Sequence, residues 1–309
     1  MNKALIAIDK SRSFRVYLAI TTTMVEDARQ IHQASPLAAA ALGRVLTGAG
    51  IMGLQLKNKE DKLTIQFKGE GPAGEILVTA NGAGSVKGYI SNPDVELPLR
   101  EDGKLNVGGA IGVGTLTVIK DLGMREPYVG KIDLVTGEIA DDLTAYFFLS
   151  EQQSTSVALG VRINTDGSTL SAGGMMIQML PDGDQEAVDA LELLLDKMTP
   201  ISSLVEEEVK RSNGKTEEAI MTGLLQTIFA DLPEKFAVET LEFRELKWDC
   251  DCSAERLEKV LISIGPGDLK EIIEEDGQAE LVCQFCEKKY HFDKEHLEQL
   301  LKESLGIGG

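Results

Sequence analysis

The four cysteines of this 309-residue chain constrain its fold more than any other feature, because all of them lie near the C-terminus. They form two close pairs, Cys250-Asp-Cys252 and Cys283-Gln-Phe-Cys286, with 30 residues between the pairs. Two pairs of sulfur donors held together make a tetrahedral four-thiolate site, the geometry that selects zinc. Each short spacer lets one pair chelate from a single backbone turn. We therefore expect Cys250, Cys252, Cys283 and Cys286 to bind one Zn²⁺ ion.

Buried free thiols and two permanent disulfides are the alternative states of these cysteines. The apolar run at the N-terminus is interrupted by Asp9, Lys10 and Arg12, whereas a signal peptide needs a longer apolar core. We therefore expect the chain to be cytoplasmic, where thiols stay reduced, and this favours the metal site. His291 follows Cys286 closely and is a possible substitute ligand, but four thiolates already complete the shell.

A four-thiolate zinc site has no open position for a substrate water, so its predicted role is structural. Zinc binding coupled to folding contributes about 10–16 kcal/mol, comparable with the stability of a whole domain, so loss of the ion should unfold the module. Thiolates are also the oxidisable form of cysteine. Oxidation would form disulfides and release the metal in one event. The cysteine spacing alone does not separate a structural site from such a redox switch.

The distribution of charge excludes one class of partner. The net charge is −19 for the chain, of which −9 lies in residues 181–240 and −8 in residues 241–309. Such a field repels nucleic acid phosphates and destabilises compact states by self-repulsion. No apolar stretch approaches the ~20 residues of a membrane-spanning helix, so we expect neither a nucleic acid nor a membrane partner.

Residues 1–180 carry strand-like runs between turn signals, and one helix that begins with Ser35-Pro36 and continues through Leu46. A second helix is expected over residues 141–150. Antiparallel hairpins with a few helices predict an α+β domain. The expected strands are Leu63–Phe67, Glu75–Thr79, Ser85–Ile90, Thr115–Ile119 and Val157–Ile163.

Residues 181–240 change to acidic helical patterns and form a predicted linker of two short amphipathic helices. These helices either simply cover the first domain or are stable only while docked on it. In the second case their release would expose apolar side chains while the charge keeps the molecule in solution. The side chains on the two stripes that we expect to bind other proteins are Leu191, Leu194, Leu195, Ile220, Leu224 and Leu225.

Residues 241–309 form the predicted zinc-binding module. Ser253 is expected to cap a helix that ends near Ile264, and Asp268 to start another. Asp276-Gly277 is a hairpin signal, and Asp293 is expected to cap a last helix that turns Leu297, Leu300 and Leu301 inward. So small a module needs a staple such as the metal.

Two signals of enzymatic function are rejected. Gly69-Glu-Gly-Pro-Ala-Gly74 fits the dinucleotide-binding pattern, but a strand-like run follows it where that fold needs a helix, so we interpret it as a turn between strands. His32 is the only histidine outside the predicted zinc module, and a structural role is expected for it. No nucleophile–base pair supports catalysis.

Several motifs in order give the chain a specific resemblance. The two cysteine pairs, with Glu274–Glu280 between them and Tyr290-His-Phe292 after them, resemble the zinc switch of the 33-kDa heat shock protein family of bacterial redox-regulated chaperones. The N-terminal matches are Ser35–Arg44, Gly69–Gly74, Gly88–Pro93, Gly137–Leu143, Ser150–Gln152 and Gly173–Pro181.

The resemblance implies a chaperone that is inactive while reduced and zinc-bound. Oxidation would pair Cys250 with Cys252 and Cys283 with Cys286, release zinc and undock the linker of residues 181–240. The exposed apolar surface would then hold unfolding client proteins without ATP, in a homodimer. The resemblance also implies a distinctive α+β fold for residues 1–180.

Two other functions remain as alternatives. A zinc-ribbon module that binds a partner protein without redox switching is compatible with the cysteines, whereas the charge of −8 opposes nucleic acid. An enzyme with a structural zinc is the second alternative, and the sequence offers it no catalytic group.

Overall fold

The computed structural model describes residues 1–305 of the chain. Two compact units are present: the first comprises Met1–Asp249, and the second begins at Cys250. Both combine helices with antiparallel strands, which confirms the predicted α+β class. The division differs from the expected module boundary at residue 241, because β10 (Val238–Glu245) pairs with β1 (Lys3–Asp9) in the first unit.

The first sheet has the strand order β10-β1-β2-β9-β8, with β2 at Phe14–Ile20, β9 at Thr169–Met179 and β8 at Thr155–Ile163. Its central strands are buried on both faces. Ala4 and Ile6 of β1 point into one hydrophobic cluster, whereas Leu5 and Ala7 point into another, as the two-residue period of a strand requires. Different elements cover the two faces.

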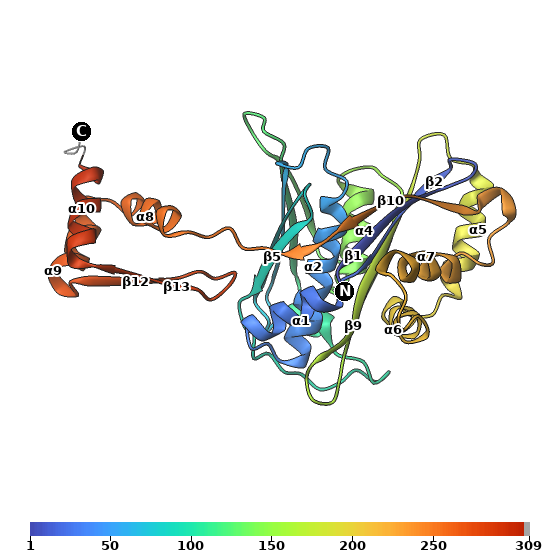
Figure 1. Ribbon diagram of the computed structural model, residues 1–309, viewed down its shortest axis with the longest axis horizontal. Coiled ribbons are helices and arrows are strands. Elements are labelled where there is room, and N and C mark those ends of the chain that lie inside the picture. Colours follow the sequence, from blue (N-terminus) through green and yellow to red (C-terminus); the bar gives the residue numbers. More distant parts are fainter. Residues whose placement is uncertain (306–309) are drawn as a thin grey trace. The chain divides into compact units, whose positions relative to one another are not determined.

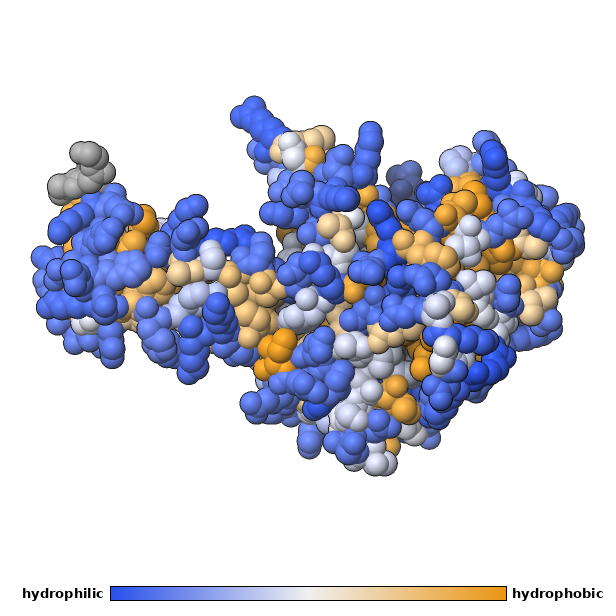
Figure 2. All heavy atoms as spheres, in the orientation of Figure 1, coloured by the Kyte–Doolittle hydropathy of each residue, from blue (hydrophilic) through white to orange (hydrophobic). Residues whose placement is uncertain are grey.

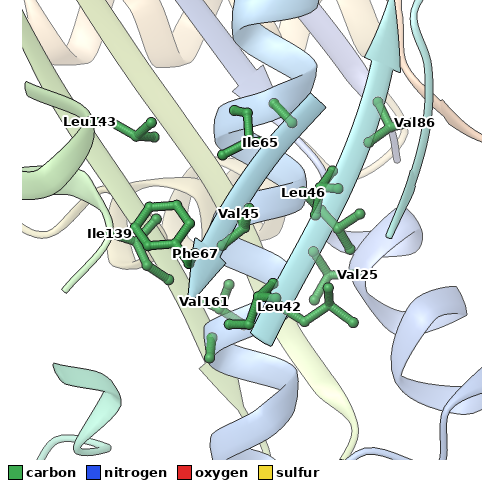
Figure 3. Packing of buried hydrophobic residues seen from close by; sticks show 14 of the residues in the cluster. Val25, Leu42, Val45, Leu46, Ile65, Phe67, Val86, Ile139, Leu143 and Val161 are labelled. Carbon is green, nitrogen blue, oxygen red and sulfur yellow. The ribbon is translucent and has the colours of Figure 1, made fainter. Parts of the chain in front are cut away.

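The larger cluster is built around α2 (Pro36–Gly53), which lies between the two sheets of the first unit (Figure 1). Ser35 accepts a hydrogen bond from the N–H of Ala38 at the start of this helix, as the capping signal predicts. Figure 3 shows Leu42, Val45 and Leu46 of α2 beneath two neighbouring strands, close to Ile65 and Phe67 of the same cluster. The second sheet has the order β11-β5-β4-β3-β6-β7. Its strands are β3 (Lys62–Gly69), β4 (Glu75–Asn81), β5 (Ser85–Ile90), β6 (Gly114–Asp121), β7 (Tyr128–Asp133) and β11 (Lys247–Trp248).

Helix α2 is the one described helix long and apolar enough to cross a membrane. Its 18-residue window is 89% buried within the protein. The apolar character of α2 is therefore accounted for by its place at the centre of the core. The remaining helices of residues 1–180 are α1 (Thr22–Ile31), α3 (Val107–Ile111) and α4 (Ala140–Leu149).

The segment of residues 181–240 holds three α-helices where the sequence predicted two. These are α5 (Gln185–Asp196), α6 (Ile201–Arg211) and α7 (Glu217–Ile228). A short 3-10 helix, η1 (Glu234–Phe236), follows them. Pro200 is the N-cap of the unpredicted α6. Their apolar sides and the outer face of β1, β2 and β9 form one cluster, so α5–α7 cover the face that α2 leaves open (Figure 1).

The chain then returns to the sheets before it reaches the cysteines. Leu246 is buried in the larger cluster, and Asp249 donates its N–H to the carbonyl of Val86. Trp248, the only tryptophan, packs edge-on against His32, whose Nε2 lies 3.0 Å from the carbonyl of Gly88. His32 thus lies in the packing of this segment, in keeping with the structural role expected for it.

The second unit contains α8 (Ala254–Ser263), α9 (Pro266–Glu275), β12 (Gln278–Val282), β13 (Lys289–Asp293) and α10 (Lys294–Ser304). Helix α9 begins at Pro266 rather than near Asp268. Asp276-Gly277 joins α9 to β12, and the turn between β12 and β13 instead contains Cys283–Cys286. Leu301 is only partly buried beside the core. Among the residues described for this unit, the buried apolar core consists of Leu261, Leu269, Ile273, Phe292, Leu297 and Leu300.

Gly69 and Gly71, at the connection between β3 and β4, let the backbone there pass close to the backbone of α3. A Cβ atom on Gly69 would lie 1.9 Å from the carbonyl oxygen of Ile111, and one on Gly71 would lie 2.4 Å from that of Ala110. A side chain at either position would collide with the backbone of α3. The strand β4 follows this turn, which agrees with its interpretation as a turn and leaves no helix N-terminus for a phosphate.

We predict that Gly69→Ala lowers the free energy of unfolding of the first unit by about 2–3 kcal/mol, because a methyl group has no space beside Ile111. Urea unfolding of the full chain measures it. Gly103→Asn is the control, since nothing lies within 4 Å of that site and asparagine tolerates its φ of +76°. Equal unfolding midpoints for the two variants would contradict the packing argument.

Candidate metal centre

The four cysteines come from two local structures of the second unit. Cys250 and Cys252 precede α8, and Cys283 and Cys286 lie in the turn that joins β12 to β13. In that turn the N–H groups of Cys286 and Glu287 donate to the carbonyl of Cys283, at 3.3 and 2.8 Å. Glu287 has a φ of +58°, so the chain reverses tightly around the pair. This turn places two thiols on one side of the hairpin.

The sulfur atoms are spaced as ligands of one ion. All four Sγ atoms lie within 4.8 Å of one another, with 3.7 Å between Cys250 and Cys283 and 3.4 Å between Cys252 and Cys286. Sulfurs bound tetrahedrally at ~2.3 Å are separated by roughly 3.8 Å, whereas a disulfide requires ~2.05 Å. The cysteines are free thiols, and their arrangement is compatible with a single bound metal ion.

Burial raises the thiol pKa of Cys250 and of Cys286. For Cys252 burial acts in the same direction, but hydrogen bonds from Tyr290 and from the other thiols outweigh it and lower its pKa to about 7. Without metal, the first two sulfurs keep their protons at neutral pH. A metal ion must displace those protons, so its affinity should rise with pH.

Tyr290 supports the site from β13. Its hydroxyl donates to Cys252, with the oxygen 3.2 Å from Sγ and 3.1 Å from the carbonyl oxygen. This bond to the sulfur raises the pKa of the Tyr290 hydroxyl to about 12, so the group stays a donor. Tyr290 belongs to the motif Tyr290-His-Phe292, but the sequence alone predicted no role for it. Tyr290 lies on the same face of β13 as buried Phe292, with exposed residues between and beside them. This period of two was the sequence signal that Tyr290 faces inward.

His291 points to the other side of the same strand. Its Nδ1 lies 3.3 Å from Glu280 Oε2 on β12, and its side chain is 72% exposed. It does not belong to the group of four sulfur ligands.

The six linker side chains expected to bind other proteins converge in one place. Leu191, Ile220, Leu224 and Leu225 are buried, and Leu194 and Leu195 are partly buried beside them. They face strands β1, β2 and β9 through side chains such as Phe14 and Leu18. In this state they are packing residues of the first unit.

Comparison with known proteins identifies the chain. A family model described as "Hsp33 protein" matches residues 2–293, which is nearly the whole chain. This chain belongs to the Hsp33 family. Two relatives named "33 kDa chaperonin" support the assignment: one from Alkaliphilus oremlandii is 47% identical over 96% of this chain and 94% of its own length. The other, from Caldanaerobacter subterraneus, is 43% identical over 93% of this chain and 94% of its own length.

A solved structure agrees over the same extent. The crystal structure of the 33 kDa chaperonin, a heat shock protein 33 homologue from Thermotoga maritima, superposes with a TM-score of 0.85 at 33% identity and covers 99% of both chains. The resemblance predicted from the motifs is thereby confirmed, and the function of this Hsp33 family member is that of a chaperone.

We predict that Tyr290→Phe weakens metal binding about tenfold, because outer hydrogen bonds to ligands typically contribute that much. His291→Ala is the matched control on the neighbouring residue and should leave the affinity unchanged. Competition of the reduced protein with a coloured chelator measures both. Equal affinities of the Tyr290→Phe variant and the unmodified protein would remove Tyr290 from the site.

Proposed function

We propose that this Hsp33 protein is an ATP-independent holdase that oxidation activates. Cys250, Cys252, Cys283 and Cys286 bind one Zn²⁺ in the reduced, inactive protein, and oxidation releases it. The observation that carries the proposal is the packing of acidic helices α5–α7 over an apolar sheet face, with an oxidisable thiol cluster further along the same chain. The donor set of four sulfurs favours zinc.

Hydrogen peroxide is the proposed oxidant of the four cysteines. Each disulfide forms when two thiolates give up two electrons to one hydrogen peroxide, which takes two protons and leaves as two waters. Two peroxides therefore convert the four thiolates into two disulfides. Disulfide sulfurs no longer carry the negative charge that binds the metal, so the ion leaves.

The proposed disulfides are Cys250–Cys252 and Cys283–Cys286, although Cys250 also lies 3.7 Å from Cys283 and Cys252 lies 3.4 Å from Cys286. The folded distances do not decide the outcome, because the module has a small core and should unfold when the metal leaves. The sulfurs of each proposed pair are close in sequence, so the unfolded segment can bring them together without the folded arrangement.

Residues 238–249 are the proposed connection between the cysteines and the linker. Val238 and Phe243 of β10 pack against the cluster beneath α5–α7, and the chain passes from Asp249 directly to Cys250. Lys3 of β1 contacts Glu218 of α7 at 2.7 Å and Glu245 of β10 at 3.8 Å. Unfolding that reaches β10 therefore removes support from α7.

Release of residues 181–240 would uncover both sides of this cluster. The client-binding surface would comprise linker side chains and the sheet face of the domain formed by residues 1–180, with residues 241–309 acting as the switch region. Excess negative charge would keep the opened molecule in solution. We propose a homodimer as the oxidised form and the cytoplasm as the location, because the switch needs a reducing resting state.

A partner-binding zinc module without redox control is the alternative function. It predicts stable metal binding and unchanged client interaction under oxidant. Neither catalysis nor nucleic acid binding is part of the proposal.

We predict that peroxide with mild heat releases one zinc per chain and makes the protein suppress aggregation of a denatured client. Zinc release is followed with a coloured chelator and aggregation by light scattering. Protein heated with reductant is the control. Reduced protein that holds the client equally well would contradict the switch, and activation without zinc release would contradict its trigger.

We also predict that Leu224→Ala gives partial holding without oxidant. Leu224 is fully buried against the sheet, so the truncation should weaken linker docking by about 2–5 kcal/mol while removing little binding surface. Val209→Ala, at an exposed site on α6, is the matched control. Limited proteolysis of residues 181–240 reports undocking. A variant that is cleaved faster yet holds no client would exclude linker release as the activating event.

A further inference from the structure

The docked linker has an open apolar groove on its outer side. The groove lies between α5, the start of α6 and the end of α7, with a volume of about 540 Å³, within the usual range of about 300–1,000 Å³ for binding pockets. Its apolar lining comprises Ala190, Leu193, Leu194, Met198, Leu204 and Ile228.

The packing of the linker leaves several of these side chains partly or largely exposed to solvent. Leu194, Met198 and Leu204 are only partly buried at the margin of the cluster, and Leu193 is 65% exposed. Figure 2 shows hydrophobic surface among hydrophilic residues in the region of α5 and α7. The groove thus offers several adjoining apolar side chains, whereas a lone exposed leucine is ordinary on a protein surface.

The rim of the groove is acidic. Asp231 lies on one side, and Asp189, Glu192 and Asp196 line an adjoining hollow beside Leu193. Among the described residues, no ion pair involves Glu192, Asp196 or Asp231. Lys197 is the one cationic residue of the lining. The local field therefore favours an occupant that carries positive charge beside an apolar face.

We propose that this groove binds a lysine- or arginine-rich amphipathic helical segment of an unfolding protein. Apolar side chains at i, i+3, i+4 and i+7 would enter between the helices, while cations on the flanks would face Asp189, Glu192, Asp196 and Asp231. A second copy of this chain is disfavoured as occupant because its net charge is −19. The same charge disfavours a nucleic acid.

The inference deepens the proposed chaperone function by naming a class of client. The groove exists while the linker is docked, so the segment can bind before oxidation. One groove of this size accommodates a few side chains and does not hold a whole unfolding protein. It would place cationic segments next to the apolar surface that undocking uncovers.

The test uses reduced, zinc-loaded full-length protein and labelled 14-residue synthetic peptides, measured by fluorescence anisotropy. One peptide has leucines on one helical face and lysines on the other. A second replaces the lysines with glutamates, and a third scrambles the lysine peptide at constant composition. We expect the lysine peptide to bind at least about tenfold more tightly than either of the others.

Two variants localise the binding. Leu193→Ser, and separately Glu192→Gln with Asp196→Asn, should each weaken the lysine peptide about threefold or more. The matched controls are Phe148→Ser, exposed on α4, and the distant exposed pair Glu60→Gln with Glu126→Gln. These controls should bind like the unmodified protein. Because all the groove side chains changed here are exposed, the variants should keep the fold, which circular dichroism checks.

Equal binding of the scrambled peptide, no binding of the lysine peptide, or equal effects of groove and control variants would each overturn the proposal. No oxidant is present, so these outcomes leave the activation mechanism untouched. Conversely, the protein could bind the peptide and yet hold no client after oxidation. That result would contradict the proposed function but would leave the groove as a binding site for cationic segments.

Discussion

The burial of one sheet on both faces is the constraint on which the structure depends. Strands β1, β2 and β9 send alternate side chains into two separate clusters. The face toward α2 is enclosed by a second sheet, whereas the other face is covered mainly by α5–α7, together with Phe236 of η1. Each leucine buried there contributes about 1.5–3 kcal/mol, so the sheet needs this cover. This face of β1, β2 and β9 is apolar, and its cover is a separate segment of the chain. If that segment leaves, the face can bind apolar parts of other proteins.

The charge of the linker and the small core of the second unit both indicate a low free energy of unfolding for these two parts. Residues 181–240 carry a charge of −9, and their surface ion pairs offset it only weakly. Within residues 250–305, the second unit has a core of six buried apolar side chains, and Leu269 and Leu297 are its most enclosed members. A bound metal, at about 10–16 kcal/mol, would be its largest single source of stability. The strand β10 joins these two marginal parts, because it packs beneath the linker helices and leads to Cys250.

Sequence patterns predicted the parts of the fold in which one face is buried and a turn residue follows. Strands β3–β6 meet both conditions, and the cysteine spacing predicted the sulfur cluster. Strand β1 was missed because it is buried on both faces and therefore shows no alternation. Helix α6 was missed because buried Glu208 interrupts its apolar stripe. That carboxylate is held by Arg211 and Ser212, and it lies against Gly223. The approach of Glu208 to Gly223 and the contact of Tyr290 with Cys252 join residues far apart in the sequence, so they need three-dimensional information.

Native-state hydrogen exchange reports directly whether oxidation undocks α5–α7, when reduced zinc-loaded protein is compared with peroxide-oxidised, zinc-free protein. We expect the amides of α5–α7 to lose their protection on oxidation, together with those of the second unit. Amides of α2 and of strands β3, β4 and β6, which lie in the enclosed core, should keep theirs. Full protection of α5–α7 in oxidised protein that holds a client would contradict the account, because the apolar sheet face would still be covered.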